Sequence, residues 1–445
     1  MQKRFHPDEI AELLNKARNN TFQLYQSVTS EDVLRRSPGF GFRPILWHLA
    51  HIGVFESYWI LQRVKGDPTI SERYDVIFDP IKTPREESKD LPSIQEMREY
   101  LSKVRQEVLS YLEDLEGNEQ SPLLQGGYIF DLVLEHEYQH QETINYLMRL
   151  LDPSAKQAPK DYSVRSDFLM WAQESKDRDM VKVEGGPFEM GSNGYLSVPF
   201  IYDNEQPRHT VHLKDFKIDR NLVTNQDFLE FINSGGYSLQ SLWSPEGWKW
   251  KEENGINLPL FWRREGDEDS SQWQVQEMFE TSELNPNLPV TGVSWHEASA
   301  YAQFVGKRLP TEAEWEKAAS WDPISKSRRC FAWGDEMPEK HLANFNNNLY
   351  GPSPVGAFPA GKSAYGCLDM TGNVWEWASS TFGPYPGFEA YPYPEYSEVW
   401  FDGDHRILKG GSWVTRAPLL RTSFRNFFRP GFRIAFAGFR CATDD

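Results

Sequence analysis

The chain has 445 residues, 39% of them hydrophobic and 14% aromatic, and a formal net charge of −18 at pH 7. This length predicts two domains, or one large domain with insertions, and the apolar content excludes a disordered chain. The negative charge disfavours nucleic acid as a partner, no apolar run approaches the roughly 20 residues of a membrane-spanning helix, and the N-terminal segment lacks the apolar core of a signal peptide, so we expect a cytoplasmic protein with no membrane partner.

Four segments in the first third of the chain carry apolar residues at spacings of three and four, which is typical of amphipathic helices. They are residues 8–28, 44–66, 93–115 and 128–151. Four such segments predict an antiparallel four-helix bundle. The connection over residues 67–92 is polar and marked by proline, so we predict no helix there. A loop of this length often serves a site, although a plain crossover explains it equally well.

The composition changes after a polar linker. From about residue 180 the sequence has short β-like runs, Gly and Pro turns and Trp-rich patches, with one clear helix near residues 296–306. We therefore predict an α+β chain, with a helical bundle in residues 1–165 and a mixed α+β domain in residues 176–445.

The cysteine content limits the kinds of metal site. Only Cys330, Cys367 and Cys441 occur. An odd and widely spread set predicts neither a disulfide framework nor a thiolate cluster, and we interpret these residues as buried and unreactive. Any metal must be held by histidine or carboxylate.

Three histidines in the helical region are candidate metal ligands. His136 and His140 are four apart in one predicted helix, which places them within about 40° on one face; two surface histidines would give the same pattern. His51 lies in a separate helix, and bundle metal sites use facing helices. Three imidazoles leave open positions and suit Fe(II), Zn(II) or another borderline ion. His48 shares the face of His51 and is a rival ligand, whereas Glu142 points to a different helix face and is better interpreted as a residue that orients the ligands or joins two helices.

The remaining motifs give weaker indications. Histidines without a partner at ligand spacing are expected to be structural: His209, His212, His296 and His405. No GxSxG, P-loop or GxGxxG element occurs, so hydrolase and nucleotide-binding functions lack support. A Pro-rich loop contains Tyr391, Tyr393 and Tyr396. These rings either pack as a small core or include a proton donor.

Several motifs together resemble the ergothioneine-biosynthesis sulfoxide synthases, also called hercynine oxygenases. The motifs are WHLAHIG and HEYQHQE, followed by GGPFEMGS, DNEQPRHTVHL, RLPTEAEWEKAA, GNVWEW, KGGSW and AGFRCA. The resemblance covers nearly the whole chain. It implies a DinB-like four-helix bundle followed by a C-type-lectin-like domain of the formylglycine-generating, sulfatase-modifying type.

The resemblance also implies an activity. Members of this family are non-haem Fe(II) enzymes that use O2 to join a thiol sulfur to C2 of the imidazole of hercynine, which gives a sulfoxide. By position, His51, His136 and His140 would be the iron ligands and Tyr393 the catalytic tyrosine, which donates a proton and steers the reaction towards C–S bond formation rather than thiol dioxygenation. The active site is expected between the domains. Some relatives bind calcium in the second domain, so calcium is a candidate ligand there.

Substrate-binding residues are carried over in the same way. Gln139 matches a residue that contacts the hercynine imidazole. Asn426 matches one that contacts the trimethylammonium end, and Phe427 stands where a Trp is familiar; an aromatic face suits a quaternary ammonium. Tyr396 would support the catalytic tyrosine. Arg85 matches an arginine that binds the carboxylate of the sulfur donor.

Departures from the family pattern concern the sulfur donor. Ser88 and Phe428 stand where the actinobacterial branch, which uses γ-glutamylcysteine, has an arginine and an aspartate. The charges that would hold a glutamyl group are missing at these two positions, so the resemblance implies free cysteine or another small thiol as the donor, unless Arg429 or Arg433 compensates. His48 also stands where an aspartate is familiar.

Other functions remain open at this stage. Formylglycine generation is excluded because Thr415 and Leu420 replace the two cysteines that this activity needs. A synthase with another sulfur or selenium donor, or with ovothiol-type coupling, is the nearest alternative. A DinB-like transferase with Zn or Ni is a second, and a non-catalytic lectin-like binding protein is the third. The sequence does not indicate the oligomeric state.

Overall fold

The chain divides into two units, Met1–Pro159 and Lys160–Asp445. The computed structural model describes residues 6–115, 121–162, 165, 168–169, 179–265 and 272–445. The expected start of the second domain at residue 176 lies outside the described residues, so this boundary stays a prediction. In the described ranges, no helix combines the length and the apolar character that a bilayer crossing needs.

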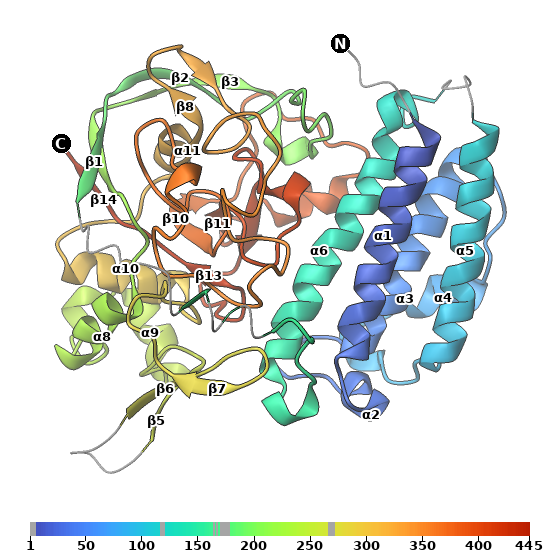
Figure 1. The fold of residues 1–445 in the computed structure, drawn as a ribbon, viewed down its shortest axis with the longest axis horizontal. Coiled ribbons are helices and arrows are strands. Elements are labelled where there is room, and N and C mark those ends of the chain that lie inside the picture. The colour runs from blue at the N-terminus through green and yellow to red at the C-terminus, as the bar shows by residue number, and fades with distance from the viewer. Residues whose placement is uncertain (1–5, 116–120, 163–164, 166–167, 170–178, 266–271) are drawn as a thin grey trace. The chain divides into compact units, whose positions relative to one another are not determined.

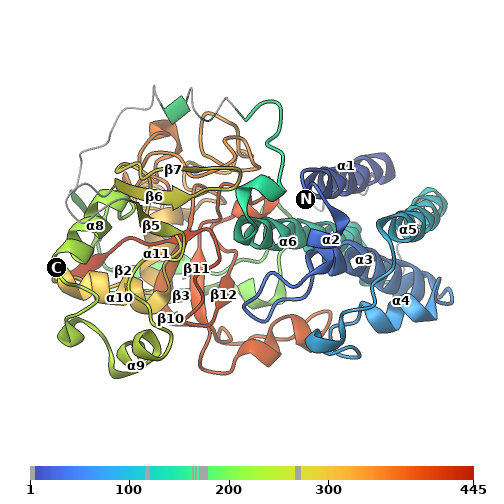
Figure 2. The same ribbon diagram turned by 90° about the horizontal axis from the view of Figure 1, so that it is seen from below.

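Four long helices build the first unit (Figure 1). They are α1 (Pro7–Gln26), α3 (Ile45–Glu56), α5 (Ile94–Asp114) and α6 (Tyr128–Leu150), and α3 continues as a π-helix, η1 (Ser57–Lys65). Figure 2 shows the same helices from a second direction: α1 contacts α5 and α6, and α3 contacts the same two helices. The four helical segments predicted from apolar spacing are confirmed.

The local sequence explains these helices. In α1, Ile10, Leu14 and Ala17 recur at spacings of four and three and are all buried. In α5, the Ser93 hydroxyl accepts a hydrogen bond from the Glu96 amide at 3.2 Å, and the Glu96 carboxylate accepts one from the Ser93 amide at 2.8 Å. Such caps contribute about 1 kcal/mol to helix stability.

A buried group of four charges joins the long helices, and each helix supplies one member. Arg18 on α1 binds Glu56 on α3 at 2.7 Å and Glu137 on α6 at 3.0 Å, and Arg105 on α5 binds Glu56 at 2.7 Å. All four side chains are buried. Burial opposes ionisation of Glu56, but Arg105 and Arg18 outweigh it and lower the pKa of this carboxyl. We call these residues the charge quartet.

The connection between η1 and α5 contains a helix, so the prediction that residues 67–92 hold none is wrong. Here Ser71 caps α4 (Glu72–Ile77), and its hydroxyl accepts a hydrogen bond from the Tyr74 amide at 3.4 Å. The Tyr74 ring is buried and stacks on Tyr100 at 4.2 Å between centroids. A cap and one aromatic anchor therefore stabilise a helix that is too short for a periodic signal. The other short helices of this unit are α2 (Glu31–Arg35), η2 (Arg85–Glu87), η3 (Gln125–Gly127) and η4 (Pro153–Ala155).

The strands of the second unit form several small sheets. One sheet has the order β1 (Met180–Val183), β4 (Phe216–Asp219), β14 (Ala442–Asp444), and another the order β12 (Asn426–Phe428), β11 (Arg406–Lys409), β10 (Trp375–Thr381), β13 (Ala437–Gly438). The others are β2 (Gly186–Met190) with β3 (His209–Leu213), β5 (Trp262–Glu265) with β6 (Gln272–Gln276) and β7 (Thr281–Glu283), and β8 (Trp321–Asp322) with β9 (Ser327–Arg328). All pairs are antiparallel except β10 with β13.

Helices complete the mixed architecture of this unit. The α-helices are α8 (Asn225–Asn233), α9 (Pro245–Glu253), α10 (Trp295–Phe304) and α11 (Glu312–Ser320). The 3-10 helices are η5 (Asp203–Glu205), η6 (Gln240–Leu242), η7 (Pro359–Gly361), η8 (Pro394–Tyr396), η9 (Glu398–Trp400) and η10 (Ala417–Leu420). The helix predicted near residues 296–306 is confirmed as α10, and the α+β class is confirmed with it.

The core of the second unit is rich in aromatic rings and contains all the cysteines. Trp375 and Trp377 of β10 are almost fully buried. Cys330, Cys367 and Cys441 are free and buried. Burial raises the pKa of Cys330 to about 12 and that of Cys367 to about 11. Because the thiolate is the reactive form, these values support the interpretation of unreactive cysteines.

Candidate metal centre

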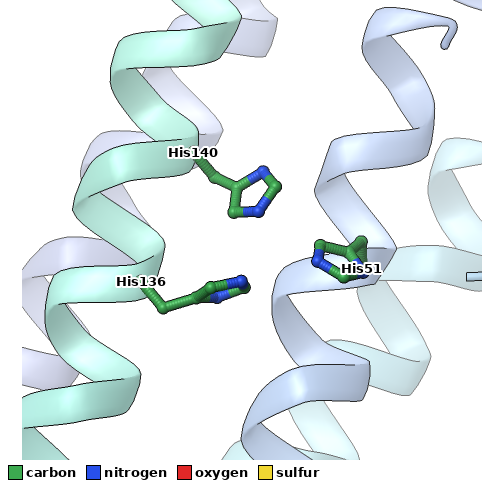
Figure 3. A group of neighbouring side chains, drawn as sticks. All are labelled: His51, His136 and His140. Carbon is green, nitrogen blue, oxygen red and sulfur yellow. The ribbon is translucent and has the colours of Figure 1, made fainter. Parts of the chain in front are cut away.

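Three histidine side chains from two helices of the first unit point towards one another (Figure 3). His51 lies on α3, and His136 and His140 lie on α6. One possible ligand atom of each residue lies within 4.8 Å of the others, and the ring centroids are 4.5 to 5.2 Å apart. Histidine nitrogens bind transition metals at about 2 Å, so small ring rotations bring all three onto one ion.

The His51 ring is oriented by the connection that contains α4. Its Nδ1 lies 2.7 Å from the carbonyl oxygen of Phe78, the residue that follows α4. Because a carbonyl only accepts, Nδ1 carries the proton and Nε2 is left as the ligand atom. Trp47 stacks on the same ring at 4.4 Å between centroids. The indole N–H of Trp47 donates to the carbonyl oxygen of Ile77 at 3.0 Å. The long connection therefore supports the site and is not a plain crossover.

His136 is held by an aromatic stack. Phe55 of α3 lies parallel to its ring, with the centroids 3.6 Å apart. Its Nδ1 is buried and has no hydrogen-bond partner among the residues that the structure describes. A buried ring nitrogen without a partner is costly, so this atom indicates a place where a group from outside the chain is expected.

His48 contacts a candidate ligand directly. Its Nδ1 lies 3.0 Å from Nδ1 of His140, and it is not a member of the three-histidine group. Burial, followed by the nearby His51, lowers the pKa of His48 to about 3, so the ring is neutral. Nδ1 of a neutral His48 can accept a hydrogen bond from His140 Nδ1, which leaves Nε2 of His140 free to bind a metal. This arrangement favours His48 as a support for His140 over the rival role as a ligand.

The electrostatics of the group fit a metal ion. Burial lowers the pKa of His51 to about 4 and holds the pKa values of His136 and His140 well below the ordinary value. Neutral imidazole is the form that binds metals, so the three rings are ready as ligands at neutral pH. His51 is buried, whereas His136 and His140 are partly exposed, so reactants can reach the group. Three neutral nitrogen donors accept Fe(II), Zn(II) and similar ions.

The other residues predicted in the first unit differ in exposure. Gln139 is partly exposed and lies on α6 between the two paired histidines. Arg85 is exposed, and its guanidinium donates to the Gly41 carbonyl at 3.2 Å. Ser88 is buried and its hydroxyl accepts a hydrogen bond from Arg43. Glu142 is buried and lies outside the three-histidine group.

The predicted tyrosines lie in the second unit. Tyr393 precedes η8 and is partly buried, and Tyr396 ends this helix. Their rings meet edge to face with centroids 6.2 Å apart. Burial, followed by the carboxylate of Asp203, raises the pKa of Tyr393. The phenol therefore keeps its proton at neutral pH, as a proton donor must.

The three residues carried over from the RNFF segment form β12. Asn426, Phe427 and Phe428 are all partly exposed. Because side chains alternate along a strand, Asn426 and Phe428 face one side and Phe427 the other. Phe427 stacks on Phe382 at 3.9 Å, and Phe428 stacks on Phe432 at 4.1 Å. The alternation separates Phe427 from Asn426, although the family resemblance implies that both contact the trimethylammonium group.

Arg429 and Arg433, the candidate replacements for the missing charges, have acidic partners within the unit. Arg433 binds Glu297 at 3.0 Å, and its side chain is 10% exposed. Arg429 is exposed and binds Asp404. Arg433 is therefore committed to an internal ion pair, whereas Arg429 is tied to a surface acid.

Two of the remaining histidines contact single protein groups. His405 contacts both carboxylate oxygens of Asp402 at 3.0 Å, and His209 contacts the Pro207 carbonyl at 2.9 Å. His296 differs from the expectation, because its buried Nδ1 has no hydrogen-bond partner in the part of the chain that the structure describes. Within the described ranges, no other group of three His, Cys, Asp or Glu side chains has metal-binding geometry. Calcium in the second unit stays a prediction, since amide and backbone oxygens also bind this ion.

Sequence reasoning missed the aromatic partners of the ligands. Trp47 and Phe55 stand four residues before and four after His51, so all three share one face of α3. This i, i+4 spacing was a usable signal. Phe78 was not predictable in the same way, because it acts through its backbone carbonyl.

Comparison with known proteins identifies both units. The DinB superfamily matches residues 13–144, and the sulfatase-modifying factor enzyme 1-like domain matches residues 167–445. A hercynine oxygenase of Mycolicibacterium smegmatis is 38% identical over 98% of this chain and 99% of its own length. A hercynine oxygenase of Mycobacterium tuberculosis is 36% identical over 98% of this chain and 99% of its own length. A formylglycine-generating enzyme of Streptomyces coelicolor is 31% identical over 61% of this chain and 91% of its own length.

These matches confirm the predicted order of a DinB-like helical unit and a sulfatase-modifying-factor-like mixed unit. The full-length relatives share both units, whereas the formylglycine-generating enzyme covers only part of the chain. The chain belongs to the hercynine oxygenase family.

Proposed function

We propose that the chain is an O2-dependent, non-haem Fe(II) sulfoxide synthase of ergothioneine biosynthesis, which joins a thiol to C2 of the hercynine imidazole. The observation that carries the proposal is the group of His51, His136 and His140 in a chain with full-length hercynine oxygenase relatives. The reaction balances as thiol plus imidazole C–H plus O2 giving sulfoxide plus water: the two hydrogens leave in water, and O2 supplies one oxygen to each product.

The metal site would hold Fe(II) through the three histidines. Bound there, iron would supply open coordination positions and the redox chemistry with O2 that the chain itself lacks. The protein holds His51 in place through the Phe78 carbonyl and the Trp47 ring, and it holds His136 through Phe55. Three reactants that meet at one ion gain the proximity that a three-component step requires.

The chain's own side chains would bind and protonate the reactants. Gln139 lies beside the histidine pair on α6 and would contact the hercynine imidazole, and Asn426 would contact its trimethylammonium end. Tyr393 would be the proton donor, with Tyr396 as its neighbour. The raised pKa of Tyr393 supports this role, because the phenol gives up its proton only to a strongly basic acceptor.

Free cysteine is the preferred sulfur donor in this proposal. Arg85 is exposed and can bind one carboxylate. Ser88 is buried against Arg43, and Arg433 is held by Glu297, so neither offers a second site for a glutamyl group. Phe428, the third residue in question, presents an apolar wall. γ-Glutamylcysteine is the alternative donor, with Arg429 as its candidate partner.

An anaerobic incubation tests the proposal. The protein is loaded with Fe(II) and mixed with hercynine and either cysteine or γ-glutamylcysteine, O2 is admitted, and the products are identified by mass. We expect the cysteine adduct of hercynine at the sulfoxide level, with O2 uptake in equal amount. Zn(II) in place of Fe(II) is the matched control, because zinc has no redox chemistry and should give no product.

The outcomes separate the alternatives. A better yield with γ-glutamylcysteine would reverse the assignment of the donor, and a product from histidine instead of hercynine would favour ovothiol-type coupling. No adduct with either thiol and no O2 uptake would overturn the proposal. The partners are small molecules, and we place the reaction in the cytoplasm, where three free cysteines would stay reduced.

A further inference from the structure

The loop that carries Tyr393 is held by a segment almost two hundred residues earlier in the chain. Asp203 is 2% exposed. One of its carboxylate oxygens accepts from the Tyr391 amide at 3.2 Å, and the other accepts from the Ser397 hydroxyl at 2.5 Å. The two donors stand on either side of Tyr393 in the sequence. One buried side chain therefore fixes both ends of a seven-residue stretch, residues 391–397.

The neighbours of Asp203 hold the same stretch. The Asn204 side chain donates to the Ser397 hydroxyl oxygen at 3.0 Å. The Tyr202 ring stacks on Tyr396, with centroids 4.2 Å apart and an interplanar angle of 12°. Three consecutive residues thus contact the tyrosine loop, and we call residues 202–204 the clamp.

The clamp is itself anchored in the core. Glu205, which follows it, is fully buried and binds Arg421 at 2.6 Å and the Ser423 hydroxyl at 2.5 Å. The same carboxylate accepts from the Tyr202 amide at 2.9 Å. Buried charge-assisted hydrogen bonds are the strong ones, so the clamp has little freedom to move.

We propose that Asp203 is a positioning residue that sets the place of the Tyr393 phenol. This inference rests on the proposed function, in which Tyr393 is the proton donor. The loop is irregular backbone with a single 3-10 turn, η8, and without the clamp it would sample many conformations. Asp203 also places a negative charge near the phenol, which favours the protonated form.

A carboxylate is required at this position because both of its oxygens must accept. Besides the two donors from the loop, the backbone amide of Asn204 donates to the Asp203 carboxylate at 2.7 Å. Asparagine has one acceptor oxygen and one donor nitrogen, so this nitrogen would face the backbone N–H of Tyr391 in one orientation and that of Asn204 in the other, whereas the Ser397 hydroxyl can donate or accept. Asp203→Asn should therefore lose one backbone hydrogen bond of the clamp in either orientation and loosen the loop at almost unchanged volume.

Two measurements on the full-length iron-loaded protein test the inference. Hydrogen–deuterium exchange reports the clamp directly: we expect amides of residues 391–397 to exchange about tenfold faster in Asp203→Asn, with no change in β1, β4 and α10. The ratio of sulfoxide to cysteine sulfinate reports the consequence, and we expect it to fall about tenfold. Ser397→Ala removes a single hydrogen bond and should change both values by about threefold.

Asp369→Asn is the matched control. This carboxylate is also buried, but it accepts from the Gly356 amide at 2.6 Å. Neither measurement should change in this variant. Unchanged exchange in Asp203→Asn and Ser397→Ala would overturn the clamp, and faster exchange with an unchanged product ratio would overturn its role in placing the phenol. Wild-type protein that forms no sulfoxide would refute the proposed function alone, because the exchange measurement still decides the clamp.

Discussion

The histidine group and the tyrosine loop are built on opposite principles. The ligands lie on two regular helices, where a spacing of four residues is enough to place two side chains on one face. The tyrosine loop has almost no regular structure, and contacts from residues 202–204 define it. Periodic backbone therefore positions the first group from local sequence, whereas the second depends on side chains from a distant segment.

Removal of a ligand should have the largest effect and tests the helical half of the comparison. We expect His140→Ala to weaken metal binding by more than about a hundredfold and to abolish turnover, because two imidazoles cannot replace three. Anaerobic titration with Fe(II), or with Co(II) as a spectroscopic probe, measures the affinity. His212→Ala is the control, since this residue is exposed on β3. Equal affinity in wild type and His140→Ala would remove the metal assignment.

The charge quartet tests whether buried charges outside the histidine group stabilise the helices that carry the ligands. Glu56→Gln leaves Arg18 and Arg105 with an uncompensated buried charge, which we expect to lower the free energy of unfolding by about 3–5 kcal/mol. Urea unfolding measures this loss. Glu253→Gln is the control, because the pair of Glu253 with Lys249 is exposed and should contribute less than about 0.5 kcal/mol. A loss below about 1 kcal/mol in Glu56→Gln would contradict the prediction.

The same residue predicts a dependence of stability on pH. The folded-state pKa of Glu56 is lowered, so its ionisation stabilises the fold above the ordinary carboxyl pKa of about 4.3. This stability is lost as the pH falls through the folded-state pKa. Between pH 7 and a pH below the folded-state pKa of Glu56, the free energy of unfolding should therefore fall more in the wild type than in Glu56→Gln. Parallel losses in the two proteins would show that Glu56 does not contribute.

Substitution of Tyr393 in the tyrosine loop should change the product and leave metal binding unchanged. Tyr393→Phe removes the phenolic proton and should lower the ratio of sulfoxide to cysteine sulfinate by about a hundredfold, within the range of a lost general acid. Metal affinity should stay at the wild-type value, because Tyr393 is not in the histidine group. Tyr365→Phe, another partly buried tyrosine of the second unit, is the control. An unchanged product ratio would remove Tyr393 from its role.

The bundle and the histidine group were largely predictable because helices repeat. Apolar spacing predicted all four long helices, and the spacing of His136 and His140 predicted a shared face. The helix α4 was missed because a cap at Ser71 and one packed ring, Tyr74, stabilise it. The charge quartet was missed because sequence alone assigns arginine and glutamate to the surface.

The tyrosine loop could not be derived from local sequence. Its anchors, Asp203 and Ser397, are 194 residues apart, and only the fold brings them together. Resemblance to a family can assign a role to Tyr393, but it does not reveal what holds this residue. The same holds for β12, where strand alternation separates Phe427 from Asn426 although the two are adjacent in the sequence.

His48 should give the smallest effect and separates a ligand from a support. His140 Nδ1 must donate to His48 Nδ1 if His140 Nε2 is to bind metal. His48→Phe removes the acceptor and should weaken metal binding about tenfold, whereas His48→Asn keeps an acceptor oxygen near the position of Nδ1 and should stay within about twofold of wild type. Calorimetric titration with Co(II) measures both. Loss of more than about a hundredfold in both variants would make His48 a ligand, and no loss in His48→Phe would show that His140 is oriented by its helix alone.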